Sequence, residues 1–232
     1  MENEMITKPA HEISFIDKVA SRRKFLGYTG VAIASGTLLV SGCKKDDNNS
    51  GINLGSGDIG ILNYAYALEQ LEAAFYTKVI SSFYTGITSA EQAILSDIQK
   101  HEVAHRDFFK AAIGSSAIPE LTFNLTSINF TSRASVLAAA KAFEDLGVSA
   151  YNGAGKLIAD VNYLLIAGKI VSVEARHAAA IRDLLNPNSA DFAGDDTIDG
   201  NGLDVARLPM DVLAIAGTYI TNQINASNLP AS

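Results

Sequence analysis

Apolar residues recur at steps of three and four along four long stretches of the chain. This period matches the turn of an α-helix and gives each stretch one buried face. Asp58 is placed to cap the first helix, Thr88 and Glu91 have the spacing of a capping box, and Gly114 is a plausible stop. The predicted helices run from about Asp58 to Tyr84, from Thr88 to Gly114, from near Ser132 through Tyr151, and from about Asp160 to Leu185, with a shorter one from Leu208 to about Gln223.

The connections between these helices alternate in length. A few residues near Thr85 join the first two helices, and residues 155–159 join the third to the fourth. A long polar and aromatic segment, residues 115–131, separates the second helix from the third. Short, long and short connections predict an all-α four-helix bundle of two helical hairpins with one long crossover, followed by the short C-terminal helix.

Two of the predicted helices carry the same pair of polar residues. Glu102 precedes His105 by three positions on the second helix, and Glu174 precedes His177 by three positions on the fourth. Residues three apart project from one face of a helix, so each pair can act on a common partner. Only three histidines follow residue 42, and two of them belong to these pairs.

The other two helices also match each other. Glu69 on the first helix and Glu144 on the third are each followed seven residues later by a tyrosine, Tyr76 and Tyr151. The chain therefore reads as two copies of one hairpin, each with a Glu…Tyr helix followed by a Glu-x-x-His helix. Such an internal repeat indicates a shared architecture for the two halves.

The segment His101-Glu102-Val-Ala-His105 also matches the His-Glu-x-x-His pattern of zinc proteases. That chemistry needs both histidines as ligands, yet Val173 stands at the position of His101 in the second copy. The extended protease pattern fails as well, because Phe108 and Ala111 occupy its glycine and histidine positions. The repeat therefore argues against a protease, and His101 is expected on the surface or in contact with a metal ligand.

One glutamate from each of two helices and Glu-x-x-His from each of the other two resembles the ferritin-like di-iron and di-manganese carboxylate proteins. The Glu-x6-Tyr spacing is similar to that of bacterioferritin and rubrerythrin helices. The phrase ALEQLEAAFY resembles a branch of bacterial and plant ferritin-like domains that includes desiccation-related proteins. The likeness covers about Asp58 to Leu185 and weakly the C-terminal tail.

The resemblance implies a ferritin-like fold and a role for each of the six matching residues. Two metal ions, iron or manganese, would be bridged by Glu102 and Glu174, although zinc would also bind. Terminal carboxylates and histidine ligands would come from Glu69, Glu144, His105 and His177. Four carboxylates balance two divalent cations, a condition for burying such charge. The alternative is that these glutamates lie on solvated helix faces.

Three further residues and one loop remain open at this stage. Glu72, one turn after Glu69, is either an additional carboxylate near the metals or a solvated residue. Tyr76 and Tyr151 either hydrogen-bond ligands or carry electrons, or are ordinary core tyrosines. The segment 195–204 resembles a calcium loop at Asp195, Asp199 and Gly200, but Thr197 and Ala206 replace two required ligands, which favours an ordinary acidic turn.

The first 42 residues resemble a twin-arginine lipoprotein signal peptide rather than part of the fold. Arg22 and Arg23 precede an apolar, small-residue stretch that ends at Cys43, the only cysteine of the chain, in a lipobox-like Val-Ser-Gly-Cys. A plain membrane anchor is the alternative. Residues 43–57 are predicted to form a flexible tether and 58–225 the ferritin-like domain. The expected location is the envelope of a Gram-negative bacterium, periplasmic or on the cell surface, with a lipid on Cys43 as the contact with the membrane.

Composition narrows the function classes. The chain has 18 Lys and Arg against 25 Asp and Glu, a net charge of −7, and no basic patch, so nucleic acid is not an expected partner. A dimer is compatible with the sequence, and any electron donor is unknown and external, since no second cysteine could help build a rubredoxin-type centre. The functions considered are redox chemistry on peroxide or dioxygen, a structural or stress-protective lipoprotein, and, least favoured, iron storage.

Overall fold

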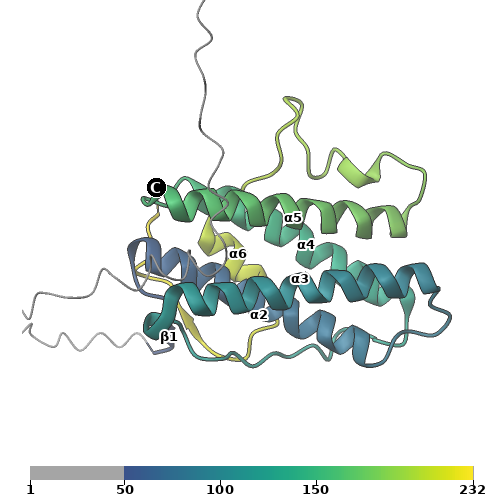
Figure 1. Ribbon diagram of the computed structural model, residues 1–232, viewed down its shortest axis with the longest axis horizontal. Coiled ribbons are helices and arrows are strands. Elements are labelled where there is room, and N and C mark those ends of the chain that lie inside the picture. Colours follow the sequence, from purple (N-terminus) through teal and green to yellow (C-terminus); the bar gives the residue numbers. More distant parts are fainter. Residues whose placement is uncertain (1–49, 232) are drawn as a thin grey trace, which may run out of the picture. The chain divides into compact units, whose positions relative to one another are not determined.

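The structure, a computed structural model, describes residues 50–231. The predicted signal peptide, Cys43 and the rest of the predicted tether up to residue 49 lie outside this range. The described chain forms the predicted all-α bundle, with helices α2 and α3 as one hairpin and α4 and α5 as the other (Figure 1). The long helices span Gly57–Ser81 (α2), Ser89–Ile113 (α3), Arg133–Gly155 (α4) and Val161–Leu185 (α5), followed by the short α6, Pro209–Ala216.

Side-chain caps fix where three of the helices begin. At α3, Thr88 Oγ1 accepts the Glu91 amide at 3.2 Å and the Glu91 carboxylate accepts the Thr88 amide at 2.9 Å, so the predicted capping box is present. At α4 and α5, Ser132 and Asp160 each accept one backbone amide of the first turn, without the reciprocal bond of a capping box. Asp58 is different from the prediction: it lies inside the first turn of α2. Its carboxylate accepts the amides of residues 159 and 160, which ties the start of α2 to the α4–α5 connection.

The segments before and after the bundle pair with each other. Strand β1, Ile52–Asn53, runs parallel to strand β2, Ile224–Asn225, and Leu54 is fully buried. The predicted flexible tether was therefore wrong for residues 52–57. The predicted C-terminal helix ends early, at Ala216, because the following residues bond the crossover, with the Thr221 amide donating to the Thr122 carbonyl.

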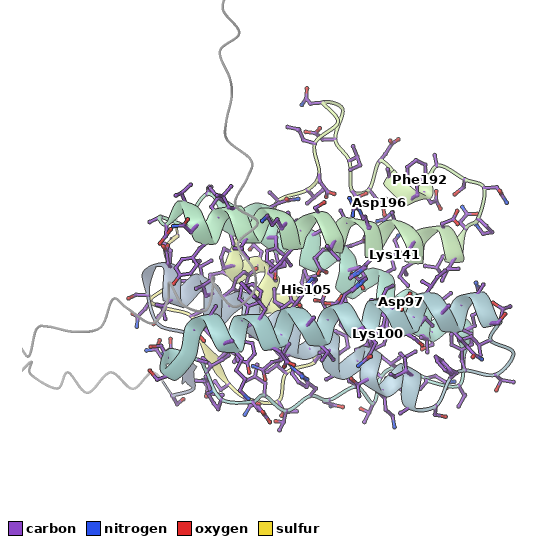
Figure 2. All side chains as sticks on the ribbon, in the orientation of Figure 1. Asp97, Lys100, His105, Lys141, Phe192 and Asp196 are labelled. Atoms are coloured by element: carbon purple, nitrogen blue, oxygen red, sulfur yellow. The ribbon has the colours of Figure 1, made fainter. Side chains whose placement is uncertain are left out.

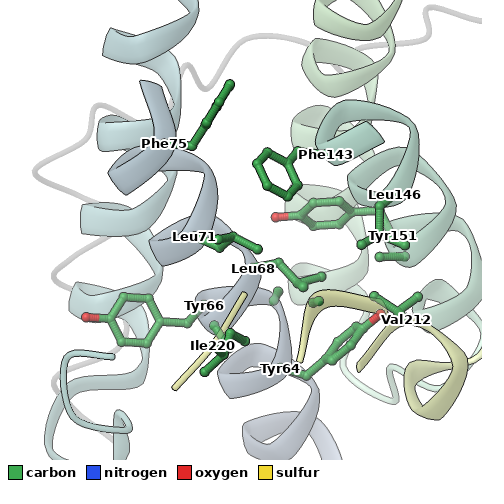
Figure 3. Close-up of a cluster of buried hydrophobic side chains, with 14 of the residues drawn as sticks. Tyr64, Tyr66, Leu68, Leu71, Phe75, Phe143, Leu146, Tyr151, Val212 and Ile220 are labelled. Atoms are coloured by element: carbon green, nitrogen blue, oxygen red, sulfur yellow. The ribbon is translucent and has the colours of Figure 1, made fainter. Parts of the chain in front are cut away.

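The core lies between the two hairpins. Helix α2 is buried on almost every side, and its Leu68, Leu71 and Phe75 face Phe143 and Leu146 of α4 (Figure 3). Aromatic edge contacts reinforce this layer, with ring centroids of Phe75 and Phe143 5.0 Å apart. The same bundle contains four fully buried glutamates. Buried carboxylates need partners, because burying an unpaired charge is costly.

Candidate metal centre

The four helices direct six polar side chains into the middle of the bundle. Glu69 comes from α2 and Glu144 from α4, while α3 and α5 each supply one Glu-x-x-His pair. His105 lies between α3 and α5 (Figure 2). All four glutamates are fully buried, so the reading of solvated helix faces is wrong for these positions. The structure thus brings together every residue of the predicted ligand set: Glu69, Glu102, His105, Glu144, Glu174 and His177.

These residues form two overlapping groups of four. The His105 quartet consists of Glu69, Glu102, His105 and Glu174, and the His177 quartet of Glu102, Glu144, Glu174 and His177. In each quartet, one candidate ligand atom from every residue lies within 4.8 Å of the others. Glu102 and Glu174 belong to both quartets, as residues that bridge two metal ions must.

The two histidines face their carboxylates in the same way. His105 Nδ1 lies 2.9 Å from Glu174 Oε1 and 3.4 Å from Glu69 Oε2. His177 Nδ1 lies 2.8 Å from Glu102 Oε1 and 3.4 Å from Glu144 Oε2. Each histidine therefore contacts the glutamate of the opposite Glu-x-x-His helix and the glutamate of one outer helix. The two halves of the sequence repeat therefore place equivalent residues in an approximately two-fold symmetric arrangement around the centre of the cluster.

The atoms that would bind a metal are also the buried atoms that lack a hydrogen-bond partner. Ten buried side-chain nitrogen and oxygen atoms within residues 50–231 have no hydrogen bond, and eight of them belong to the two quartets. Unpartnered buried polar groups are rare because each costs about 1–3 kcal/mol, and more when charged. Divalent cations between the carboxylates would satisfy all eight atoms, and the oxygen and imidazole donors suit iron or manganese.

Two tyrosines hold the outer glutamates from the opposite hairpin. Tyr76 Oη of α2 donates to Glu144 Oε1 of α4 at 2.5 Å, and Tyr151 Oη of α4 donates to Glu69 Oε1 of α2. The other oxygen of each glutamate, Oε2, has no hydrogen bond and faces its quartet. The two tyrosines therefore belong to the buried core and also hydrogen-bond two of the candidate ligands.

Glu72 is buried beside the cluster, so the solvated alternative is wrong. Its counterpart in the repeat is Gly147, and a Cβ at that glycine would lie 2.9 Å from Glu72 Oε1 and 3.6 Å from Glu174 Oε2. Gly147 therefore leaves the space that the Glu72 carboxylate occupies. Burial and repulsion by Glu174 and Glu102 raise the pKa of Glu72 well above its ordinary range.

His101 contacts a residue of the cluster. Its Nδ1 lies 2.9 Å from Nε2 of His177, and the two ring planes are nearly parallel with centroids 5.1 Å apart. From the sequence, His101 was expected either on the surface or in contact with a metal ligand. In the structure it is exposed and also contacts the candidate ligand His177.

Mutual attraction between the histidines and the carboxylates shifts their pKa values when no metal is bound. Burial lowers the pKa of His105, but its contacts with Glu102, Glu174 and Glu69 outweigh burial and raise the pKa to about 12. Burial raises the pKa of Glu102, yet the two histidines bring it down to about 2. Burial raises the pKa of Glu69 to about 7 despite its contact with His105. Metal binding would have to displace the protons that the raised pKa values leave on His105 and Glu69.

The acidic segment 195–204 behaves as a turn. The carboxylate of Asp199 accepts the backbone amides of Asn201 and Leu203, which is an Asx-type turn. Asp196 pairs with the buried guanidinium of Arg182, which also makes a two-bond contact with Asp145 at 2.8 Å. Arg182 was not singled out from the sequence, because its partners lie 37 and 14 residues away and follow no local pattern.

Comparison with known proteins agrees with this geometry. A family model described as the ferritin-like domain matches residues 57–187, more than half of the chain. The matched range begins at the first residue of α2 and ends two residues after α5, so it contains both quartets. A comparison with curated proteins gives no match.

Proposed function

Since this chain belongs to the ferritin-like domain family, we propose that it binds two ions of iron or manganese in its two quartets and uses them in redox chemistry on peroxide or dioxygen. The observation that carries the proposal is the convergence of eight buried ligand atoms that make no hydrogen bond at the centre of the bundle. A pair of such ions can exchange two electrons with a bound peroxide or dioxygen.

The side chains have distinct tasks in this proposal. Glu102 and Glu174 hold both metal ions and fix their separation, because each contributes oxygens to both quartets. Glu69 and Glu144 each bind one ion with Oε2, while a tyrosine hydroxyl holds Oε1. That hydrogen bond limits rotation of the carboxylate and keeps it pre-organised for the metal. Electrons come from an external donor.

The apolar surroundings of the glutamate cluster are compatible with redox chemistry at bound metal ions. Phe75, Phe143 and Leu71 belong to the buried apolar core, and the four glutamates of the quartets are fully shielded from water. A dry site strengthens the attraction between carboxylates and cations. The side chain of His105 is 13 % exposed and that of His177 6 %, so the cluster lies nearest the solvent at His105. Small molecules such as peroxide would enter from that side.

The test is metal content followed by turnover. The full-length chain, purified in detergent and loaded with iron or manganese, is analysed for metal per chain beside Glu102→Ala and Glu174→Ala. Glu120→Ala is the matched control, because Glu120 is an exposed glutamate that pairs only with exposed Lys110. We expect about two ions per chain in the wild type and the control, and a loss in the other two variants. Fewer than one ion per chain, unchanged by Glu102→Ala and Glu174→Ala, would exclude the dinuclear centre.

Activity is measured on the same samples. Hydrogen peroxide is added to the metal-loaded chain, and peroxide loss and the optical spectrum of the metal are followed. We expect turnover faster than that of the free metal ion in the wild type and in Glu120→Ala. An inert spectrum with turnover no faster than free metal would leave a structural or stress-protective role as the better account.

We further propose that the protein is exported by the twin-arginine route and anchored to the envelope through a lipid on Cys43. The support is the order of motifs in residues 21–43. No helix within residues 50–231 is long and apolar enough to cross a membrane. Cys43→Ala is expected to move the protein from the membrane fraction to the soluble fraction. Replacing Arg22 and Arg23 by lysine is expected to retain it in the cytoplasm, and lipidated protein in the membrane fraction from both variants would refute the assignment.

A further inference from the structure

We propose that His101 is a positioning residue that makes the two metal positions unequal, so that the His177 quartet fills before the His105 quartet. This inference rests on the proposed metal-binding function and adds an order of loading to it. It comes from a difference between the two halves of a cluster that is otherwise close to symmetric.

The first observation is the hydrogen bond behind His177. When Nδ1 of His177 binds a cation, the ring proton must sit on Nε2. That proton then points at Nδ1 of His101, 2.9 Å away, which accepts it if His101 carries its own proton on Nε2. The ring planes are only 7° from parallel and the centroids lie 5.1 Å apart, so the rings meet edge to edge, as an N–H···N hydrogen bond in the ring plane requires. A metal-binding histidine whose second nitrogen is engaged is fixed in tautomer and orientation.

The second observation is that His105 has no equivalent partner. Within residues 50–231, no protein atom forms a hydrogen bond with Nε2 of His105. By the repeat, Val173 on α5 occupies the place that His101 occupies on α3, and valine offers no acceptor. The side chain of His105 is also more exposed than that of His177, 13 % against 6 %. The ring of His105 is therefore held less firmly before a metal arrives.

A third observation points the same way and involves a different residue. Glu72 Oε1 and Glu174 Oε2 both lie against Gly147, and Glu174 Oε2 is the oxygen that faces His177. Glu174 Oε1, in contrast, is the oxygen that faces His105. The additional carboxyl group thus lies on the His177 side of the centre, where it increases the attraction for a cation once it releases its proton. In the second copy of the repeat, Gly147 stands at the position of Glu72, so no equivalent carboxyl group is supplied to the His105 side.

The experiment is a titration of the metal-free full-length chain with manganese(II) alone, followed by electron paramagnetic resonance and by metal analysis. In the wild type we expect the spectrum of isolated manganese up to one equivalent, and that of a spin-coupled pair only as the second ion binds. His101→Phe retains an aromatic ring but removes the acceptor nitrogen. We expect it to weaken binding of the first ion about 10- to 100-fold and to bring the coupled pair in earlier.

Two further variants separate the hydrogen bond from packing. His101→Gln keeps a carbonyl acceptor at similar reach and is expected to retain the order of loading. Val173→His adds the missing partner and is expected to tighten the second ion. Wild-type loading with two ions of equal affinity, unchanged in His101→Phe, would overturn this inference and leave the dinuclear centre intact. A wild type that binds no manganese or iron would overturn both.

Discussion

Replacing Glu69 by glutamine should change the stability of the metal-free protein in a pH-dependent way. Burial and repulsion by Glu102 raise the pKa of Glu69 from 4.5 to about 7. Without metal, this carboxyl binds its proton more tightly in the folded chain than in the unfolded one. The stabilisation is fully present below pH 4.5 and is lost as the pH rises to about 7. The shift corresponds to about 3 kcal/mol, which Glu69→Gln removes.

The assay is urea denaturation in the presence of a chelator at pH 4.5 and pH 7.5. The difference in unfolding free energy between Glu69→Gln and wild type should move by about 3 kcal/mol in favour of the variant between these two values. Glu91→Gln is the matched control. Although burial raises the pKa of Glu91, hydrogen bonds from Thr88 and Arg133 lower it to about 2. Its contribution is therefore constant between pH 4.5 and 7.5 and declines only in stronger acid.

The reasoning would be refuted if Glu69→Gln and Glu91→Gln changed alike over this range, or if Glu69→Gln lost stability relative to wild type as the pH rose. The same variant should bind metal more weakly, because it removes one negative ligand from the His105 quartet. A single substitution is thus expected to stabilise the metal-free chain at neutral pH and to impair the metal-loaded one, which is the usual relation between a functional site and stability.

Two other substitutions test separate parts of the structure. Gly147→Ala places a Cβ 2.9 Å from Glu72 Oε1 and should reduce manganese affinity. Its control is Gly168→Ala, whose Cβ would have nothing within 4 Å; this variant should leave manganese affinity unchanged and stabilise α5 by up to about 1 kcal/mol. Equal manganese affinities of the two variants in titration would contradict this. Arg182→Met breaks the buried two-bond pair with Asp145 and should cost about 3 kcal/mol in urea denaturation. Lys141→Met removes only a half-exposed pair and should cost under about 1 kcal/mol; equal costs would contradict the role of Arg182.

The convergence of the six candidate ligands was predictable because its information is local and repeated. Glu102 and His105 lie about one helical turn apart, so helix geometry alone places them on the same face, whatever packs around the helix. The second copy, Glu174 and His177, then shows which neighbouring residues are not repeated, and for that reason His101 could be separated from the candidate ligands. The helix ends at Thr88 and Asp160 were predictable on the same grounds, since capping is decided within four residues.

Contacts between distant segments could not be read in this way. The pairing of Ile52 with Ile224 joins two short polar and apolar stretches that have no strand period, and it turned part of a predicted tether into an element of the fold. The contact between His101 and His177 spans 76 residues and depends on how α3 and α5 meet. The burial of Glu72 depends on the absence of a side chain at Gly147, which becomes informative only once α2 and α4 are seen to pack.

Anomalous diffraction at the manganese or iron edge, from crystals of the metal-loaded protein, tests the central claim most directly. The account predicts two peaks inside the bundle. One should lie among the ligand atoms of the His105 quartet and the other among those of the His177 quartet, with Glu102 and Glu174 in contact with both. A map with no peak among these residues, or with peaks only at exposed carboxylates, would contradict it.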